Sequence, residues 1–216
     1  PSNIRCTVTA KSGRNLSRLP PFLGGARIGL LGGSFNPAHA GHVHLTREAL
    51  RILRLDQVWW LVSPQNPLKA SSGMAPFASR LKGATEVIVR AGLMRRVTAT
   101  DIESRLGVTH TARTLHFLRQ RYPRLAFVWL MGADNLAQIS RWRRWTAIFR
   151  AVRVAVFDRS PYSYKALASR AAARFSGSRV PAKTLWRRTP PAWSYVAMRR
   201  HPASASAIRA ATLRKP

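Results

Sequence analysis

The chain has 216 residues and a mass of 24.1 kDa, with 37 lysines and arginines against 7 aspartates and glutamates, a formal net charge of +30. The length favours one domain, and a hydrophobic fraction of 46% excludes wholesale disorder because it can supply a buried core. The charge indicates attraction to anions, among them nucleotides, nucleic acids, phosphosugars and acidic membranes. Because the basic residues are spread along the whole chain, a compositional background is favoured over a dedicated nucleic-acid surface.

Two further absences in the sequence narrow the class of protein. A single cysteine, Cys6, cannot form an internal disulfide framework or a cysteine zinc site, so a reducing, cytoplasmic location is expected. No apolar run approaches the roughly 20 residues that span a bilayer, which excludes an integral membrane protein.

The chain begins with a basic segment and continues with alternating strands and helices. Residues 1–26 hold four basic residues and no acid, and they are predicted to form an extension outside the fold, with a transit peptide as the second interpretation. Apolar runs then predict strands at 27–31, 57–62, 96–100, 126–131 and 152–157, and helical periods predict helices at 40–53, 76–90 and 111–122. This alternation predicts an α/β fold, a Rossmann-like doubly wound parallel sheet, in a single domain over 27–216.

Beyond Asp158 the alternation weakens. A helix over about 164–174, a strand over 193–197 and a terminal helix from about Ser204 are expected, so that a small helical C-terminal portion follows the sheet from about residue 159.

The loop after the first strand, Gly32-Gly33-Ser34-Phe35-Asn36-Pro37-Ala38-His39-Ala40-Gly41-His42, has the composition of a phosphate-binding loop. The two glycines are expected to let the backbone turn sharply and present amide N–H groups to an anion, next to a helix N-terminus. The loop matches neither GxGxxG nor GxxxxGK[ST], so neither a nicotinamide-cofactor fingerprint nor a P-loop is present.

His39 and His42 are the candidate catalytic side chains of this loop. Their spacing of three places both imidazoles on one face of the first helical turn, where two ring N–H donors could stabilise charge at a reacting phosphorus. Lone histidines are more often capping or solvent-exposed residues, and His44 and His116 receive that interpretation. A zinc site is not expected because no HExxH or cysteine pattern accompanies the histidines.

The segment GGSFNPAHAGH resembles the signature of the nucleotidylyltransferase superfamily, whose [HT]xGH motif matches residues 39–42. Four further segments are similar to those of the bacterial nicotinate-nucleotide adenylyltransferase family: SPQNPLK at 63–69, TDIESRLG at 100–107, LMGADNLAQISRWRRW at 130–145 and SASAIR at 204–209. The resemblance covers about residues 27–210. It implies an enzyme of NAD biosynthesis that transfers the adenylyl group of ATP to nicotinate mononucleotide.

The resemblance also implies roles for particular residues. On the ATP side, His39 and His42 would contact phosphates, and a second phosphate motif near the C-terminus would supply Arg209 for catalysis; the other ATP-binding residues would be Gly32, Gly33, Ser34, Phe35, Asp134, Ser204 and Ser206. On the acceptor side, Trp142 would stack on the nicotinate ring, and Lys69, Thr111 and Gly132 would line the mononucleotide pocket.

Some residues keep two interpretations. Trp142 could pack in the core with Trp145, and the SASAIR segment could be an ordinary capped helix with a surface arginine. Asp101 and Glu103 could be structural carboxylates or pocket residues. Arg113 stands where relatives often carry an aspartate, and it could alter binding or simply face solvent.

Mg²⁺ is expected as a cofactor held mainly by the ATP phosphates, without a metal site made by the protein alone. Adenylyl transfer to nicotinamide mononucleotide or to phosphopantetheine is the nearest alternative function, and a basic nucleic-acid-binding module without catalysis is a more distant one. No membrane partner and no specific nucleic-acid partner are expected, and the oligomeric state stays open.

Overall fold

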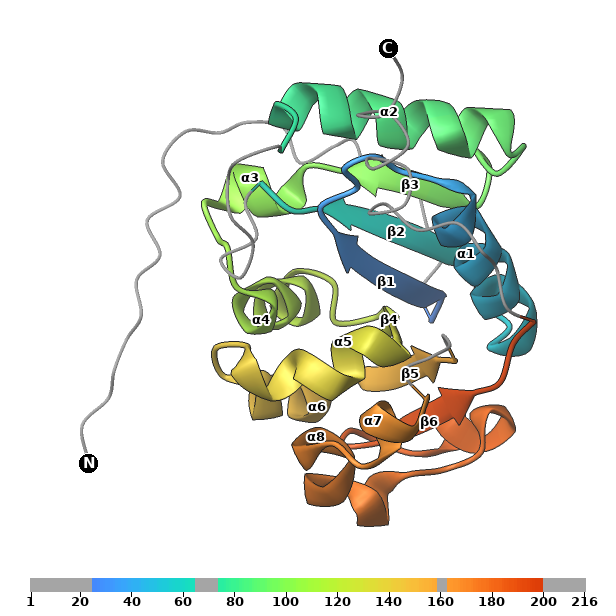
Figure 1. Cartoon of the computed structure of the whole chain (residues 1–216), viewed down its shortest axis with the longest axis vertical. Helices are drawn as coiled ribbons and strands as arrows, with labels where there is room; N and C mark the ends of the chain where they lie inside the picture. The colour runs from blue at the N-terminus through green and yellow to red at the C-terminus, as the bar shows by residue number, and fades with distance from the viewer. Residues whose placement is uncertain (1–24, 65–73, 159–162, 200–216) are drawn as a thin grey trace.

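The computed structural model of the chain describes residues 25–64, 74–158 and 163–199. Six parallel strands form one sheet in this part of the chain, and helices lie on both of its faces (Figure 1). The strands are β1 (Arg27–Gly33), β2 (Gln57–Val62), β3 (Val97–Thr100), β4 (Ala126–Gly132), β5 (Arg153–Phe157) and β6 (Trp193–Val196). The five strands predicted from apolar runs and the sixth expected over 193–197 are confirmed, as is the Rossmann-like fold class.

The strand order is β3-β2-β1-β4-β5-β6, and every neighbouring pair is parallel. The central strands are buried on both faces; β2 and β4 each expose only their first residue in part. Burial on both faces explains why QVWWLV and AFVWLM are continuous apolar runs without alternation.

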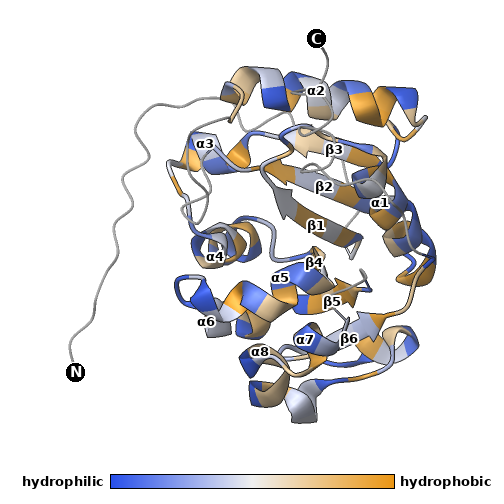
Figure 2. Cartoon of the chain, in the orientation of Figure 1, coloured by the Kyte–Doolittle hydropathy of each residue, from blue (hydrophilic) through white to orange (hydrophobic). Residues whose placement is uncertain are grey.

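The longer helices are α1 (Ala40–Ile52), α2 (Phe77–Arg90) and α4 (Thr111–Arg121), which agree with the three predicted ranges to within one residue at each end. α1 and α2 carry apolar and polar positions side by side along their length (Figure 2), as amphipathic helices do. Shorter helices escaped prediction because five to seven residues show too little of a helical period: α3 (Ile102–Leu106), α5 (Ala133–Gln138) and α6 (Trp145–Ala151).

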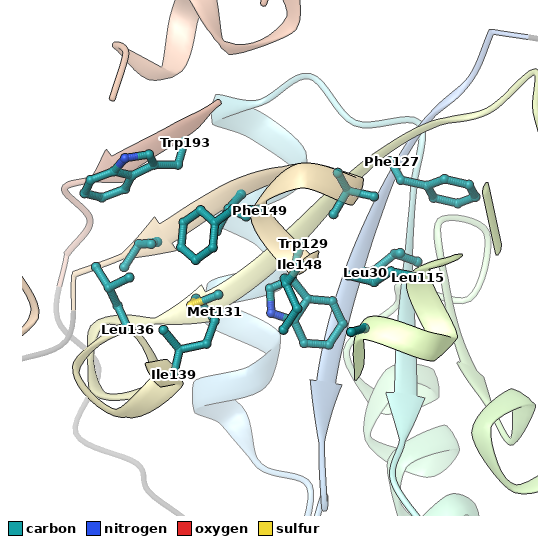
Figure 3. Packing of buried hydrophobic residues seen from close by; sticks show 14 of the residues in the cluster. Leu30, Leu115, Phe127, Trp129, Met131, Leu136, Ile139, Ile148, Phe149 and Trp193 are labelled. Atoms are coloured by element: carbon teal, nitrogen blue, oxygen red, sulfur yellow. The ribbon is translucent and has the colours of Figure 1, made fainter. Parts of the chain in front are cut away.

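Each face of the sheet has its own hydrophobic cluster. α1, α2 and the 3₁₀ helix η3 (Ala182–Arg187) pack on one face, whereas α3 to α6 and the helices near residue 170 pack on the other. Figure 3 shows the second cluster, where Trp129 and Met131 of β4 lie among Ile148 and Phe149 of α6 and Leu136 of α5.

The segment beyond Asp158 differs from the prediction in one respect. The single helix expected over about 164–174 is two short helices, α7 (Ser163–Leu167) and α8 (Arg170–Arg174). Ser169 separates them because its backbone is extended and its hydroxyl accepts a hydrogen bond from the Ala172 N–H at 3.3 Å, which starts a new helix. Two 3₁₀ helices, η2 (Ser176–Ser178) and η3, then lead to β6. The terminal helix expected from Ser204 and nearly all of the 1–26 segment lie outside the described residues.

Candidate active site

The sheet reverses its direction of growth between β1 and β4. From β1 the chain leads into α1 on one face, and from β4 it leads into α5 on the opposite face. In open α/β sheets ligands bind at such a switch point, beyond the carboxyl ends of the two strands. The loop Gly32–His42 and the segment Gly132–Asp134 therefore meet where a ligand is expected.

The backbone at the end of β1 turns at a different residue from the one predicted. Gly32 and Gly33 belong to the strand and do not adopt a positive φ; the left-handed residue is Phe35, with φ of 46°. Gly32 is required for another reason, because a Cβ there would lie 2.3 Å from the Trp129 ring. The expectation that the glycines make the sharp turn is wrong: the absent side chain of Gly32 makes room for Trp129, and a Cβ at Gly33 would lie 3.3 Å from the Phe35 ring.

His39 and His42 lie together at the start of α1, as predicted. His39 is the N-cap residue, and its Nδ1 accepts from the Gly41 N–H at 3.0 Å, while Nδ1 of His42 accepts from the His39 N–H at 3.2 Å. The two rings are 3.9 Å apart between centroids. Because each Nδ1 is an acceptor, the proton of each neutral ring resides on Nε2, which is the nitrogen that can donate.

An aromatic stack supports this histidine pair. Phe35 is 2% exposed, its ring stacks on Trp60 with centroids 4.9 Å apart, and the His42 ring lies 4.7 Å from the Phe35 ring. Trp60 donates its indole N–H to the hydroxyl of Thr46 at 2.9 Å. The Phe35 side chain therefore packs in the core beside the histidine pair. Sequence reasoning missed Trp60 and Thr46, because a tryptophan in a buried strand and a threonine in a helix carry no specific signal.

A buried arginine, Arg80 of α2, lies beneath the same loop and was also missed. Its guanidinium donates to the carbonyl of Ser34 at 2.6 Å, and to the carbonyls of Ser63 and Pro64 at 2.8 and 2.9 Å. The side chain is 4% exposed. It connects the loop after β1 with the loop after β2, whose SPQNPLK motif begins at Ser63.

On the β4 side, Gly132 ends the strand and is the N-cap residue of α5, and Asp134 lies in the first turn of that helix. The prediction that Asp134 stands at the carboxyl end of a strand is confirmed. Both residues face the same edge of the sheet as Gly33, because β1 and β4 are neighbours in parallel register from Arg27 paired with Ala126 to Leu31 paired with Leu130.

Trp142 and Thr111 occupy partly exposed positions. Trp142 caps the 3₁₀ helix η1 (Ile139–Arg141) and packs at the rim of the core, whereas Trp145 begins α6 and makes edge contacts to Phe149 and Phe175. The two tryptophans do not share a helix, since Trp142 lies before α6, but both pack against the same hydrophobic cluster, as the core-packing interpretation expected. Thr111 is the first residue of α4 and is half-buried.

The acidic residues after β3 have structural partners. Asp101 pairs with Arg105 at 2.8 Å, and Glu103, 6% exposed, accepts from the hydroxyl of Thr114 at 2.9 Å. Burial raises the pKa of Glu103 to about 7, and the Thr114 bond opposes this only in part. Arg113 is exposed, in agreement with the solvent-facing interpretation.

Four predicted site residues, Lys69, Ser204, Ser206 and Arg209, lie outside the described residues. Residue 199 is the last described residue. His44 of α1 contacts the Arg199 carbonyl at 2.5 Å through Nε2, so residue 199 lies beside the helix that begins at the histidine pair. His44 therefore has a backbone partner far along the chain, whereas His116 is exposed as predicted.

Within residues 25–64, 74–158 and 163–199, no three histidine, cysteine, aspartate or glutamate side chains gather as metal ligands would. Across the same ranges, the helices are too short or too polar to cross a bilayer.

Comparison with known proteins agrees with this architecture. Residues 30–211 match the model of the cytidylyltransferase-like family. A protein of Gluconobacter oxydans named "probable nicotinate-nucleotide adenylyltransferase" is 50% identical over 186 residues, which is 85% of this chain and 93% of that protein. A protein of Cereibacter sphaeroides with the same name is 51% identical over 185 residues, 85% of this chain and 96% of that protein. The chain belongs to the cytidylyltransferase-like family and, within it, to the nicotinate-nucleotide adenylyltransferases.

A solved structure shares the fold. The nicotinic acid mononucleotide adenylyltransferase of Plasmodium falciparum, complexed with NaAD, superimposes with a TM-score of 0.66 at 16% identity. The superposition covers 86% of this chain and 83% of that one. At this identity the likeness concerns the arrangement of strands and helices.

Proposed function

We propose that the chain transfers the adenylyl group of ATP to nicotinate mononucleotide, forming deamido-NAD and pyrophosphate. The observation that carries this proposal is the histidine pair at the switch point of the sheet. His39 and His42 have rings 3.9 Å apart, each held by a backbone hydrogen bond to Nδ1. Membership of the nicotinate-nucleotide adenylyltransferases supports the choice of reaction and of acceptor.

The reaction needs charge stabilisation more than proton abstraction. An oxygen of the mononucleotide phosphate attacks the α-phosphorus of ATP, and the bond from that phosphorus to the β-phosphate oxygen breaks. A phosphate monoester is largely ionised at neutral pH, its second pKa being about 6, so no protein base is required. Nε2–H groups of His39 and His42 would donate to oxygens on the α-phosphate as negative charge accumulates there.

ATP would lie across the loop that joins β1 to α1. Backbone N–H groups over Gly32–Phe35, together with the N-terminus of the 13-residue helix α1, suit a polyphosphate. Asp134 would accept hydrogen bonds from ribose hydroxyls at the end of β4. Ser204, Ser206 and Arg209 remain predicted partners of the leaving diphosphate.

Nicotinate mononucleotide would occupy the other side of the switch point. The partly exposed Trp142 offers a flat surface to the pyridine ring. Thr111 at the start of α4, Gly132 at the end of β4 and Lys69 are the proposed polar contacts to the acceptor. Lys69 rests on the resemblance of the SPQNPLK motif alone.

Mg²⁺ is part of the proposal as a partner of ATP. Mg²⁺ would be held mainly by the ATP phosphates and water, because it is a hard cation that binds oxyanions and retains several waters. When bound, the ion would neutralise charge on the polyphosphate and favour departure of pyrophosphate.

The proposal is tested by incubating the protein with ATP, Mg²⁺ and either nicotinate mononucleotide or nicotinamide mononucleotide, and by following pyrophosphate release. We expect release with both acceptors to be measurable and faster with the nicotinate form. Absence of release with nicotinate mononucleotide, or faster release with the amide, would contradict the assignment.

His42→Ala tests the histidine role. Loss of one donor to the transition state typically lowers kcat by 10²-fold or more, and we expect a loss of about that size. His116→Ala is the matched control, because His116 is an exposed histidine on α4. A His42→Ala enzyme whose kcat stays within about threefold of the parent, at the same stability, would show that this imidazole has another role.

A further inference from the structure

Arg80 has an unusual environment for a charged side chain. It lies in the first turn of α2 with 4% of its surface exposed. Four of its hydrogen bonds end on main-chain carbonyls: those of Ser34, Ser63 and Pro64, and that of Ala75, which accepts from Nε at 3.0 Å. Three separate segments of the chain therefore meet on one guanidinium.

Carbonyl dipoles, and no carboxylate, surround this charge. Among the described residues no acidic side chain forms an ion pair with Arg80. Burial lowers the pKa of Arg80, which is the cost of removing a guanidinium from water. Such a group is retained in a core only when its donors are satisfied, and the four carbonyls satisfy most of its five N–H groups.

The bond to Ser34 has a geometric consequence for the neighbouring amide. The Ser34–Phe35 peptide is trans, so its C=O and N–H point in opposite directions. Because the Ser34 carbonyl points at Arg80 with a distance of 2.6 Å, the Phe35 N–H points away from the buried guanidinium. Polarisation of the carbonyl by a cation also strengthens the N–H of the same peptide as a donor.

Further hydrogen bonds connect the Ser34–Phe35 peptide to the loop after β2. Ser63 donates its N–H to the Gly33 carbonyl at 2.9 Å, and its own carbonyl accepts a hydrogen bond from Arg80. Asn36 accepts from the Ala75 N–H at 3.2 Å, next to the Ala75 carbonyl that Arg80 also binds. The loop after β1 and the first residues after β2 thus share one set of hydrogen bonds with Arg80 at its centre.

We propose that Arg80 is a positioning residue for adenylyl transfer: without touching either substrate, it orients the Phe35 N–H toward the ATP phosphates and holds the start of the 63–69 motif in register with it. The inference rests on the proposed function. It differs from a purely structural role, because it requires the Phe35 amide to respond to ATP and that response to depend on Arg80.

The Phe35 amide can be observed alone, because Ser-Phe occurs once in the chain, at residues 34 and 35. Protein labelled with ¹³C at serine carbonyls and ¹⁵N at phenylalanine amides gives one HNCO peak. ATP and Mg²⁺ are added without mononucleotide, so that no turnover occurs. We expect the wild-type peak to shift on saturation with ATP, and in Arg80→Lys we expect less than half of that shift.

The same variants are then assayed for transfer. Arg80→Lys keeps the charge and loses the planar fork of donors, and Arg80→Met also removes the charge. We expect kcat to fall by about 10- to 100-fold in Arg80→Lys, since small misplacements of binding groups cost this much, and further in Arg80→Met. The KM for nicotinate mononucleotide should rise as well. Arg90→Lys and Arg90→Met are the matched controls, because Arg90 is exposed at the other end of α2.

Folded Arg80→Lys protein with wild-type kcat, KM and ATP-dependent shift would overturn the proposal. If neither variant folds, the wild-type titration is read at two signals, the Phe35 amide and the Nε–H of Arg80. An unmoved Phe35 peak, or a Phe35 peak that shifts while the Arg80 signal stays in place, overturns the proposal, and parallel shifts of both signals support it. Failure of the proposed function is separable, because a wild type that binds ATP with the expected shift but releases no pyrophosphate refutes the reaction and leaves the orientation of Phe35 by Arg80 intact.

Discussion

The buried carboxyl of Glu103 makes the stability of the protein depend on pH. Burial raises its pKa from 4.5 to about 7 in the folded chain. Below pH 4.5 the group is protonated in the folded and unfolded states alike. Between the two pKa values the folded chain keeps a proton that the unfolded chain releases, so the free energy of unfolding falls as the pH rises. Above about pH 7 the full loss is present.

The size of this loss follows from the shift. At 1.36 kcal/mol per pKa unit, a rise from 4.5 to about 7 corresponds to about 3 kcal/mol. Glu103→Gln removes the titration while its amide oxygen can still accept from Thr114. We therefore expect the variant to gain stability relative to the parent as the pH rises, by about 3 kcal/mol between pH 4.5 and pH 8.5.

Urea unfolding followed by tryptophan fluorescence measures the difference, because other titrating groups act equally on both proteins. Glu86→Gln is the control: Glu86 is exposed, lies 4.0 Å from Lys82, and should give a small difference. A difference between Glu103→Gln and the parent that stays constant from pH 5 to pH 8 would refute the argument that burial holds this proton.

Three further outcomes are expected. Gly32→Ala should lower the free energy of unfolding by about 1–3 kcal/mol, because its Cβ would meet the Trp129 ring. Gly83→Ala should instead raise the free energy of unfolding by up to about 1 kcal/mol, since nothing lies within 4 Å of a Cβ at that helical position. Urea unfolding of the two variants checks both expectations. Trp142→Ala should raise the KM for nicotinate mononucleotide about fivefold and leave that for ATP nearly unchanged, since one aromatic contact contributes about 1 kcal/mol; equal effects on both would contradict stacking. Arg113→Asp should change neither KM by more than about twofold, because surface substitutions have small effects, and a larger change would place Arg113 at the pocket.

The sheet was predictable because its strands are continuous apolar runs, separated by segments whose apolar residues repeat with a helical period. Burial on both faces leaves few residue types available to β2 and β4, so their sequences carry the signal directly. The split between α7 and α8 was not predictable, since Ser169 in an alanine-rich stretch acts as a cap only through the backbone conformation around it.

The site shows a similar division. His39 and His42 could be predicted as site residues because two imidazoles at this spacing follow a glycine-rich strand end. Arg80 could not be predicted, since it is one of 31 arginines and its partners are main-chain carbonyls, which have no sequence signature. Gly32 was expected to make the sharp turn, but Phe35 makes it. The actual requirement for glycine at position 32 is the close approach of Trp129, which depends on tertiary packing that the sequence does not display.

The strand order also has a consequence for how the protein folds. β1, β2 and β3 are successive in the sequence and adjacent in the sheet, so they can associate through local contacts. The switch point needs β1 to pair with β4, and the His44 contact to Arg199 joins positions still further apart. Such distant contacts form slowly because a long loop must first close. The region that would bind substrates is thus among the last to become complete, and a partly folded chain would hold its early strands before it could bind a nucleotide.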